Sequence, residues 1–289
     1  MKRANTLSTV AVLAALAVVT QVVGAHGNKA SATVNASANA NAATTLTQDY
    51  QQGNEFRWHE PLAAGRLIEI KGVNGGVEAE PSSGGEVEVV AVKRARRSNP
   101  DDVRIEVVHT AEGVTICAVY PNPGGEPNTC TPGRGGHNSV RDNDTSVSFT
   151  VRVPAGVRFA GRTVNGKVSA DNLGADVEAT TVNGSINVST TGLARAQTVN
   201  GSINVTMGRA DWQGEMEFKT VNGGINVSFP ASLAADVEAR TTNGDISTDF
   251  PLTVQGTFGR RHLSGSIGGG GRELRLETVN GSVQIRRAS

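Results

Sequence analysis

Thr180-Thr-Val-Asn-Gly-Ser-Ile-Asn-Val188 is the stretch of sequence that decides the fold, because close variants of it recur along the chain. Every copy contains an Asn-Gly pair. From residue 165 onward the glycines of these copies, with a degenerate copy at 263–265, follow one another at intervals of 16 to 22 residues. A period of this length indicates a repeat architecture rather than an active site. The pairs are Asn74-Gly75, Asn165-Gly166, Asn183-Gly184, Asn200-Gly201, Asn222-Gly223, Asn243-Gly244 and Asn280-Gly281.

Two local structures could explain an Asn-Gly pair between apolar runs. In a β-hairpin the pair forms a two-residue type I′ turn, and Val182 then lies on the polar face with Ser185 and Asn187. If the segment instead stays extended through the glycine, side chains alternate, so Val182 and Ile186 both point inward. Valine precedes Asn-Gly in six of the seven copies, and only the extended alternative buries it each time. We therefore favour the extended alternative over a meander of hairpins.

The positions expected to be buried change parity just before each copy. Val177 and Ala179 are odd-numbered, whereas Val182 is even-numbered, which predicts a corner or bulge between them. Strand, corner, strand and loop within about 20 residues make one coil of a β-solenoid, and such coils must stack to bury their apolar rows. The sequence therefore predicts an all-β, single-stranded β-helix or β-solenoid.

Stacked coils would bring the asparagines of the repeats into register. Side chains of Asn183 and its equivalents would then form a ladder of amide hydrogen bonds, with a spacing of about 4.8 Å between coils. Under this hypothesis the asparagines are a structural device and not a recognition surface. Loss of one amide, as in Asn200→Asp, should harm stability before it harms any binding.

The first residues predict an exported protein. Met1-Lys2-Arg3 precede an apolar run over 10–23, and small residues follow at 23–25, which is the pattern of a secretory signal peptide. A membrane anchor needs about 20 apolar residues, and Thr20 and Gln21 interrupt this run. We expect a signal peptide over 1–25, a flexible linker rich in Ala, Asn, Ser and Thr over 26–60, and one repeat domain over 61–289. No transmembrane segment is expected after cleavage.

The chain departs from the simple repeat between the first two copies. Alternating apolar residues predict strands over 66–71, 86–92, 103–108, 114–120 and 146–153. The segment 121–144 is rich in Gly, Pro, Asn and charge, so we expect it to leave the body of the fold. Cys117 and Cys130, the two cysteines of the chain, flank or lie within this excursion. In an exported protein such a pair is expected to form a structural disulfide. A redox-active pair would be spaced more closely, as in Cys-x-x-Cys.

Composition and motifs argue against several kinds of activity. The chain has 27 basic and 27 acidic residues, so no global field favours nucleic acid as a partner. The five histidines are scattered without the spacing of metal ligands. Neither a Gly-x-Ser-x-Gly elbow nor a phosphate-binding loop with its lysine occurs. The sequence thus predicts no catalytic residue, no cofactor and no bound metal.

An enzymatic alternative comes from the architecture. Parallel β-helices include polysaccharide lyases and hydrolases, and glycosidases use paired carboxylates on either side of the scissile bond. The candidate carboxylates occupy different phases of the repeat, and aromatic residues make up only 4% of the chain. Solvated charges on strands are therefore the favoured interpretation, with a carbohydrate-active β-helix enzyme as the alternative. The candidates are Asp171, Asp176, Asp236, Glu238, Asp245 and Asp249.

A row of threonines raises a further possibility. Thr181, Thr198, Thr220, Thr241 and Thr278 each stand two residues before the asparagine of a copy. An ice-binding surface would use threonines in this way, but it would need paired Thr-x-Thr ranks on a flat face. Those ranks are absent from the sequence.

The tandem Thr-Val-Asn-Gly-Ser-Ile-Asn-Val copies, preceded by Pro-Ala-Gly at 154–156, resemble the bacterial family of adhesin-like proteins catalogued as domain of unknown function 4097 (DUF4097). The repeat is also similar to the head domains of autotransporter adhesins. The likeness covers about residues 62–287, and the excursion at 121–144 departs from it. The resemblance implies an extracytoplasmic, right-handed β-helix with no established catalytic residues.

The function expected on this basis is that of a non-enzymatic, exported protein of the cell envelope. It would act as an adhesin-like structural or binding module, with an envelope or surface partner, protein or glycan, that the sequence leaves unknown. Its location would be periplasmic, cell-surface or secreted.

Overall fold

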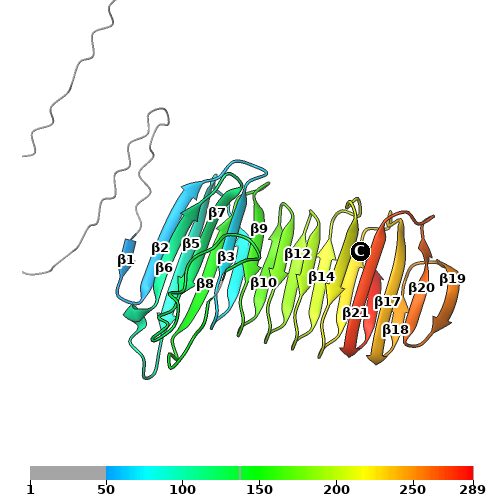
Figure 1. Cartoon of the computed structure of the whole chain (residues 1–289). Coiled ribbons are helices and arrows are strands. Elements are labelled where there is room, and N and C mark those ends of the chain that lie inside the picture. The colour runs from blue at the N-terminus through cyan, green and yellow to red at the C-terminus, as the bar shows by residue number, and fades with distance from the viewer. Residues whose placement is uncertain (1–49, 137, 289) are drawn as a thin grey trace, which may run out of the picture. The chain divides into compact units, whose positions relative to one another are not determined.

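The structure, a computed structural model, describes residues 50–136 and 138–288. Two 11-stranded sheets, here called sheet A and sheet B, make up this part of the chain (Figure 1). The strands of sheet A, in spatial order, are β1 (Tyr50–Gln52), β2 (Glu55–Pro61), β5 (Glu86–Arg94), β8 (Ser146–Val153), β4 (Val77–Pro81), β10 (Val168–Leu173), β12 (Ile186–Thr190), β14 (Ile203–Met207), β16 (Ile225–Phe229), β22 (Val283–Arg287) and β18 (Ile246–Thr248).

Sheet B has the same number of strands, and one short helix lies outside both sheets. The strands of sheet B, in spatial order, are β19 (Leu252–Gly259), β20 (His262–Ile267), β17 (Ala235–Asn243), β21 (Glu273–Asn280), β15 (Glu215–Lys219), β13 (Ala194–Gln197), β11 (Val177–Thr180), β9 (Arg158–Arg162), β3 (Leu67–Lys71), β7 (Gly113–Val119) and β6 (Arg104–His109). The helix is the 3₁₀ turn η1 (Pro100–Asp102). Among the described residues no helix has the length and hydrophobicity that a membrane span requires.

Each repeat contributes one strand to each sheet. In the copy quoted above, β11 ends at Thr180 in sheet B, and β12 begins at Ile186 in sheet A. Both strands pair in parallel with their counterparts in the next copy, β13 and β14. Because the strands on either side of Asn183-Gly184 lie in different sheets, the pair forms a corner and not a hairpin turn. The predicted β-solenoid is confirmed.

The coils do not stack in the order in which they occur in the sequence. The coil of β21 and β22, the last in the chain, lies between the coil of β15 and β16 and that of β17 and β18. At the other end, the coil of β3 and β4 lies between β7 and β8 on one side and β9 and β10 on the other. The antiparallel hairpin of β19 and β20 covers the free edge of β17.

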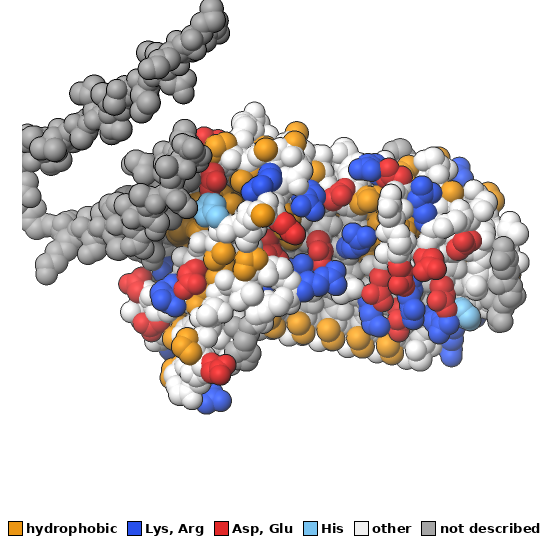
Figure 2. All heavy atoms as spheres, turned by 45° about the horizontal axis from the view of Figure 1, so that its top comes forward, with side chains coloured by type: hydrophobic (Ala, Val, Ile, Leu, Met, Phe, Trp, Pro, Cys, Tyr) orange, Lys and Arg blue, Asp and Glu red, His pale blue; other side chains and the backbone are white. Residues whose placement is uncertain are grey.

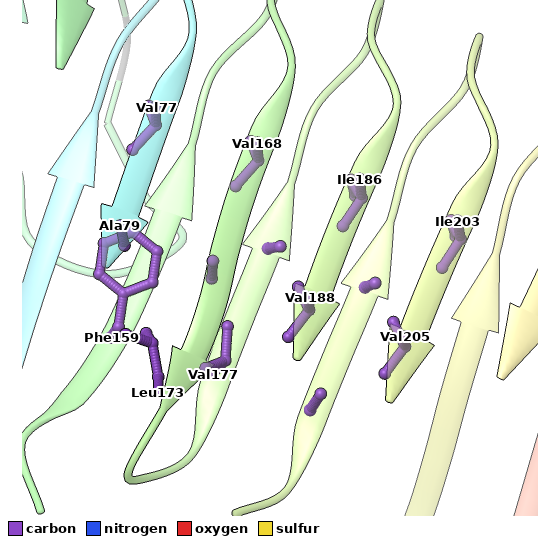
Figure 3. Packing of buried hydrophobic residues seen from close by; sticks show 14 of the residues in the cluster. Val77, Ala79, Phe159, Val168, Leu173, Val177, Ile186, Val188, Ile203 and Val205 are labelled. Atoms are coloured by element: carbon purple, nitrogen blue, oxygen red, sulfur yellow. The ribbon is translucent and has the colours of Figure 1, made fainter. Parts of the chain in front are cut away.

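The core lies between the two sheets. Inward positions alternate with outward ones along the strands of the repeats, as in the buried, exposed, buried pattern of β14, whereas β7 is buried along its whole length. Figure 3 shows the result: Val77, Val168, Ile186 and Ile203 occupy the same place in successive coils and stack on one another. Each such side chain contributes about 1.5–3 kcal/mol by leaving water. Stacking of identical apolar rows is therefore what holds the coils together.

At the corner the predicted register is wrong. Val182 is 37% exposed and Val199 is 39% exposed, whereas Thr181 and Thr198 are 2% and 5% exposed. The odd parity of Val177 and Ala179 continues through Thr181, and the turn takes place within Val-Asn-Gly itself. The segment thus does not stay extended through the glycine, and the threonine, not the valine, points inward.

The strands predicted around the first repeat are present. β3, β5, β6, β7 and β8 match the five predicted segments, and the described residues of the 121–144 segment form no strand. Among the described residues the first strands are β1 and β2, which lie before residue 61, where the sequence predicted that the repeat domain begins. In β2, Phe56 and Trp58 are 3% and 2% exposed and pack into the core. The predicted signal peptide and the part of the predicted linker over 26–49 lie outside the described residues.

Candidate functional site

The corner asparagines form a continuous ladder. In each step the side-chain Nδ2 of one asparagine donates to the Oδ1 of the asparagine before it in the stack, at 2.7 or 2.8 Å. The ladder follows the order of the stacked coils and not the order of the sequence, since Asn280 stands between Asn222 and Asn243. The predicted amide ladder is present in this structure. Its members, in stacking order, are Asn74, Asn165, Asn183, Asn200, Asn222, Asn280 and Asn243.

The glycine of each pair lets the coils approach closely. A Cβ on Gly201 would lie 2.0 Å from the carbonyl oxygen of Gly184, and the same is true at the equivalent positions of neighbouring coils. No side chain fits at this distance. In addition, the Gly201 N–H donates to the carbonyl oxygen of Asn222 at 2.9 Å. The glycines therefore belong to the packing of the corner.

The inward threonines complete the corner. Thr198 Oγ1 donates to the carbonyl oxygen of Gly184 in the neighbouring coil at 2.9 Å, and Thr181 Oγ1 donates to that of Gly166 at the same distance. Thr163, Thr220, Thr241 and Thr278 repeat the bond. The row of threonines that suggested an ice-binding surface is buried and bonded. The row is visible in the sequence but its role is not, because each hydroxyl pairs with a carbonyl oxygen that only the stacking of the coils brings near.

The valines form an outer row along the same corner. The Val199 N–H donates to the carbonyl oxygen of Val182 at 3.3 Å, and Val221 and Val279 continue the stack. Figure 2 shows a row of hydrophobic side chains along its lower edge. The row is narrow, one side chain per coil, and the exposed polar ladder of asparagines lies beside it.

The outer face of sheet A carries a second amide ladder. Asn204 Nδ2 donates to Asn187 Oδ1, and Asn226 Nδ2 donates to Asn204 Oδ1, both at 2.9 Å. Gln284 occupies the next place in register, beside Asn226. A hollow on this face is lined by these asparagines and by Asp171, Ser189, Thr206, Ser228 and Arg286. Several coils thus offer the same pattern of amide and hydroxyl groups to the solvent.

The excursion (residues 121–144) returns to the outer face of sheet B, where Lys71 holds it. Lys71 Nζ donates to three backbone carbonyl oxygens of this segment, those of Thr131, Gly133 and Gly135, at 2.6, 2.9 and 2.7 Å. Burial lowers the pKa of Lys71 from its ordinary value. Glu69 opposes this shift, and Arg162 adds to it. Lys71 of β3 thus binds the excursion through three hydrogen bonds from a charged group, a contact here called the clasp.

Glu69 forms the centre of this clasp. Its side chain is 1% exposed and accepts hydrogen bonds from Arg162 Nε at 2.9 Å, the Gly133 N–H at 2.8 Å and Thr115 Oγ1 at 3.0 Å. Arg162 also pairs with Glu178 at 3.0 Å. These bonds tie the Glu69 carboxylate to β7 through Thr115, to β9 through Arg162 and to the excursion through Gly133. The arrangement fits a structural role better than acid–base chemistry.

The disulfide between Cys117 and Cys130 is present and ties the same segment to β7. The Cα atoms of the two cysteines are 5.5 Å apart, within the usual range. A disulfide of this kind is typical of proteins that fold in an oxidising compartment. The interpretation of the pair as structural agrees with its position at the base of the excursion.

The carboxylates proposed for the enzymatic alternative do not converge. Asp171, Asp245 and Asp249 lie on or beside the strands of sheet A, whereas Asp176, Asp236 and Glu238 belong to sheet B. The carboxylate of Asp176 accepts a hydrogen bond from the Leu193 N–H. That of Asp236 accepts one from the Gly271 N–H and one from the Ser266 hydroxyl. In the view of Figure 2 the acidic and basic side chains are interspersed across the face. This pattern is typical of solvated strand charges.

Metal ligands do not gather either. Within residues 50–136 and 138–288, no group of three or more His, Cys, Asp or Glu side chains could hold a metal ion. His109 pairs with Glu60 at 2.7 Å, and the nearest carboxylate to His262 is Glu238 at 4.0 Å. His26 and His137 lie outside the described residues.

Comparisons with known proteins confirm the resemblance drawn from the repeats. Residues 145–286 match the model of a family described as Toastrack DUF4097. No curated protein matches the sequence.

Two solved structures are also similar. One is described as a putative cell adhesion protein from Clostridium sporogenes ATCC 15579, with 9% identity and a TM-score of 0.43 over 80% of this chain and 99% of that one. The other, a putative adhesin from Bacteroides fragilis NCTC 9343, has 11% identity and a TM-score of 0.37 over 82% of this chain and 98% of that one. Likenesses at this level support no inference about what this chain does.

Proposed function

We propose that this chain, a Toastrack DUF4097 protein over residues 145–286, is a non-enzymatic binding module that is exported to the cell envelope. The observation that carries the proposal is the outer face of sheet A. There Asn187, Asn204 and Asn226 present one amide per coil in register, and the hydroxyls of Ser189, Thr206 and Ser228 accompany them.

A partner with a repeating polar surface, an envelope glycan or an extended protein segment, would meet the same donors and acceptors in each coil. Each contact is worth about 1 kcal/mol, but several contacts in register reinforce one another because the later ones form within an existing complex. A flat array of this kind suits adhesion or scaffolding. It does not suit a reaction, which needs groups that converge on one bond.

Export is the second part of the proposal. The apolar run over 10–23 with its basic start supports a cleaved signal peptide, and the disulfide fits an oxidising compartment. N-terminal sequencing of the mature protein should begin near residue 26. A protein that keeps Met1 and carries free thiols in cells would contradict this part.

Binding is tested with purified protein and isolated cell envelopes of the organism that encodes it. A variant with serine at Asn187, Asn204 and Asn226 should lose most of its binding while it keeps the solenoid. Asn200→Asp is the matched control, because it removes an amide from the corner ladder and leaves the sheet A face intact. It should lower the melting temperature and keep the binding of the folded fraction. If Asn200→Asp abolished binding at an unchanged melting temperature, the corner would be the recognition surface and this assignment would be wrong.

A carbohydrate-active enzyme is the alternative. Incubation with envelope polysaccharides, followed by measurement of new reducing ends and of unsaturated products, distinguishes the two functions. We expect neither product. Turnover that disappears in a variant of one of the carboxylates, such as Asp236→Asn, would establish the enzyme instead.

A further inference from the structure

We propose that Asn243 is a site of spontaneous covalent modification, at which the side-chain amide is converted to an acid through a cyclic imide. The other Asn-Gly pairs are protected from this reaction by the stacking of the coils. This inference is independent of the proposed binding function, because it concerns only the chemistry of the corner.

The reaction needs a free backbone nitrogen after the asparagine. The nitrogen of the following residue attacks Cγ of the asparagine, a new N–Cγ bond forms, and the Cγ–Nδ2 bond breaks. Ammonia leaves with the proton that the backbone nitrogen gives up. Water then opens the five-membered imide at either carbonyl, so the net change is one water consumed, one ammonia released, and aspartate or isoaspartate formed. Glycine in the second position favours the attack, since it has no Cβ to hinder the approach.

In the interior coils this nitrogen is occupied. The Gly184 N–H donates to the carbonyl oxygen of Asn200 and the Gly201 N–H to that of Asn222, both at 2.9 Å. The asparagine side chain is held as well. Asn200, for example, donates to Asn183 Oδ1 and accepts from Asn222 Nδ2, each at 2.7 Å. Attack would require that the backbone bond break and that the side chain leave the ladder.

Asn243 differs because its coil is the last in the stack. The Gly244 N–H has no hydrogen-bond partner among the described residues. The side chain of Asn243 keeps one ladder bond, from its Nδ2 to Asn280 Oδ1 at 2.8 Å, and its Oδ1 accepts none. The turn between β19 and β20 supplies acceptors to the N–H groups of Thr241 and Ile246 on either side. It does not bond to Gly244. Both restraints that protect the interior pairs are therefore weakened here.

Asn74 at the other end of the ladder provides an internal comparison. Its side chain also has only one ladder bond, accepted from Asn165 Nδ2 at 2.8 Å. The Gly75 N–H, however, donates to the carbonyl oxygen of Asn165 at 2.9 Å. The side chain of Asn74 thus has one ladder bond, like that of Asn243, but the backbone nitrogen of the following glycine is hydrogen-bonded. Comparison of the two separates the effects of the two restraints.

The product would alter the end coil. A carboxylate at position 243 would place an oxygen against Asn280 Oδ1, which now accepts a hydrogen bond, and it would lie near Asp245 in sequence. Isoaspartate would also lengthen the backbone by one carbon and disturb the register of β17 on β21. Chemical ageing would therefore begin at this end of the solenoid.

The test uses the full chain, incubated in mildly alkaline buffer at physiological temperature and then digested with trypsin. Cleavage after arginine and lysine places each Asn-Gly pair in its own peptide, with Asn243 in the peptide 241–260 and Asn200 in the peptide 196–209. Mass spectrometry follows the conversion of amide to acid in each peptide. We expect Asn243 to react about tenfold faster than Asn200 or more, a ratio that corresponds to about 1.4 kcal/mol of opening free energy at the interior corner.

Two controls make the result decisive. In concentrated urea all the pairs should react at similar rates, and Asn243→Gln should keep the fold and abolish the conversion in peptide 241–260. The proposal is overturned if Asn243 reacts no faster than Asn200 in the folded protein, or if its excess rate persists in urea. It is also overturned if Asn74 reacts as fast as Asn243, because the free Gly244 nitrogen would then not be the cause.

Discussion

The interior coils and the excursion at 121–144 are held to the fold in opposite ways. In the coils around Asn183 and Asn200 one set of contacts recurs: an inward apolar row, a threonine hydroxyl on a glycine carbonyl, and an amide ladder. The excursion has no repeated contact. Lys71 holds it through three backbone carbonyl oxygens, Glu69 through the Gly133 N–H, and the Cys117–Cys130 disulfide through a covalent bond.

This difference has a physical consequence. Contacts between repeated coils are each small and add up along the stack, so stability is shared among nearest neighbours. Contacts of the excursion differ from one another, so no equivalent contact in a neighbouring coil replaces one that is lost. Damage to a coil should therefore lower global stability, whereas damage to the clasp should loosen one loop and leave the solenoid in place.

The largest effect is expected at a corner glycine. Gly201→Ala would put a Cβ 2.0 Å from the carbonyl oxygen of Gly184, so two coils would have to separate. We expect a loss of about 3 kcal/mol or more in the free energy of unfolding, or failure to fold. Chemical denaturation measures this. Gly85→Ala is the control, because nothing lies within 4 Å of a Cβ there, and it should be nearly neutral. Equal effects of the two changes would show that the coils are not closely stacked.

Removal of the disulfide tests the other region. Replacing Cys117 and Cys130 together with alanine should lower the free energy of opening the excursion by roughly 3 kcal/mol on the chain-entropy account. Because the bond spans the excursion, hydrogen exchange should accelerate over 121–144 and stay unchanged in β12 and β14. Faster exchange in β12 and β14 as well would mean that the excursion stabilises the stacked coils. The two regions would then not be held independently.

Substitutions at two neighbouring corner residues compare the buried threonine with the exposed valine. Thr198→Val removes the bond to the Gly184 carbonyl oxygen and leaves that acceptor unpaired, at a cost of about 1–2 kcal/mol. Val199→Ala should cost well under about 1 kcal/mol, because that side chain is 39% exposed. Denaturation of both variants measures the difference. A larger loss for Val199→Ala would restore the inward valine that the sequence predicted.

The last effect, at the base of the excursion, depends on pH. Tyr120 donates its hydroxyl to the Thr145 carbonyl oxygen at 2.9 Å. Burial raises its pKa from 10.0 to about 12, and the hydrogen bond to Asn74 opposes the shift. The folded protein thus binds the phenol proton more tightly than the unfolded chain does. Its contribution to stability is complete below pH 10 and is lost as the pH rises toward 12.

Denaturation at increasing alkaline pH measures this contribution. Tyr120→Phe should flatten the decline in stability above pH 10 and cost about 1 kcal/mol at pH 7, because the Thr145 carbonyl oxygen loses its donor. A decline of the same steepness in that variant would place the titrating group elsewhere.

Much of the site was visible in the sequence because it depends on local order. The period of Asn-Gly predicted the coils, and the shared place of Asn183 and Asn200 in the period predicted the ladder. The disulfide followed from two cysteines in a chain whose first residues predict export. By contrast, the clasp of Lys71 on Thr131, Gly133 and Gly135 left no pattern, because backbone carbonyl oxygens have the same chemistry in every residue.

The sequence by itself determined that this protein is a stack of β-coils with asparagine at each corner, since alternation along a strand and repetition along the chain are local properties. The tertiary structure alone decided which of Thr198 and Val199 points inward. A corner can form on either side of the valine, and only a neighbouring carbonyl oxygen makes the hydroxyl the better buried group. It also decided the order of the coils. Equivalent repeats can pair with one another in any order, so the place of β21 and β22 before β17 and β18 depends on which apolar rows and edges meet when the chain is folded.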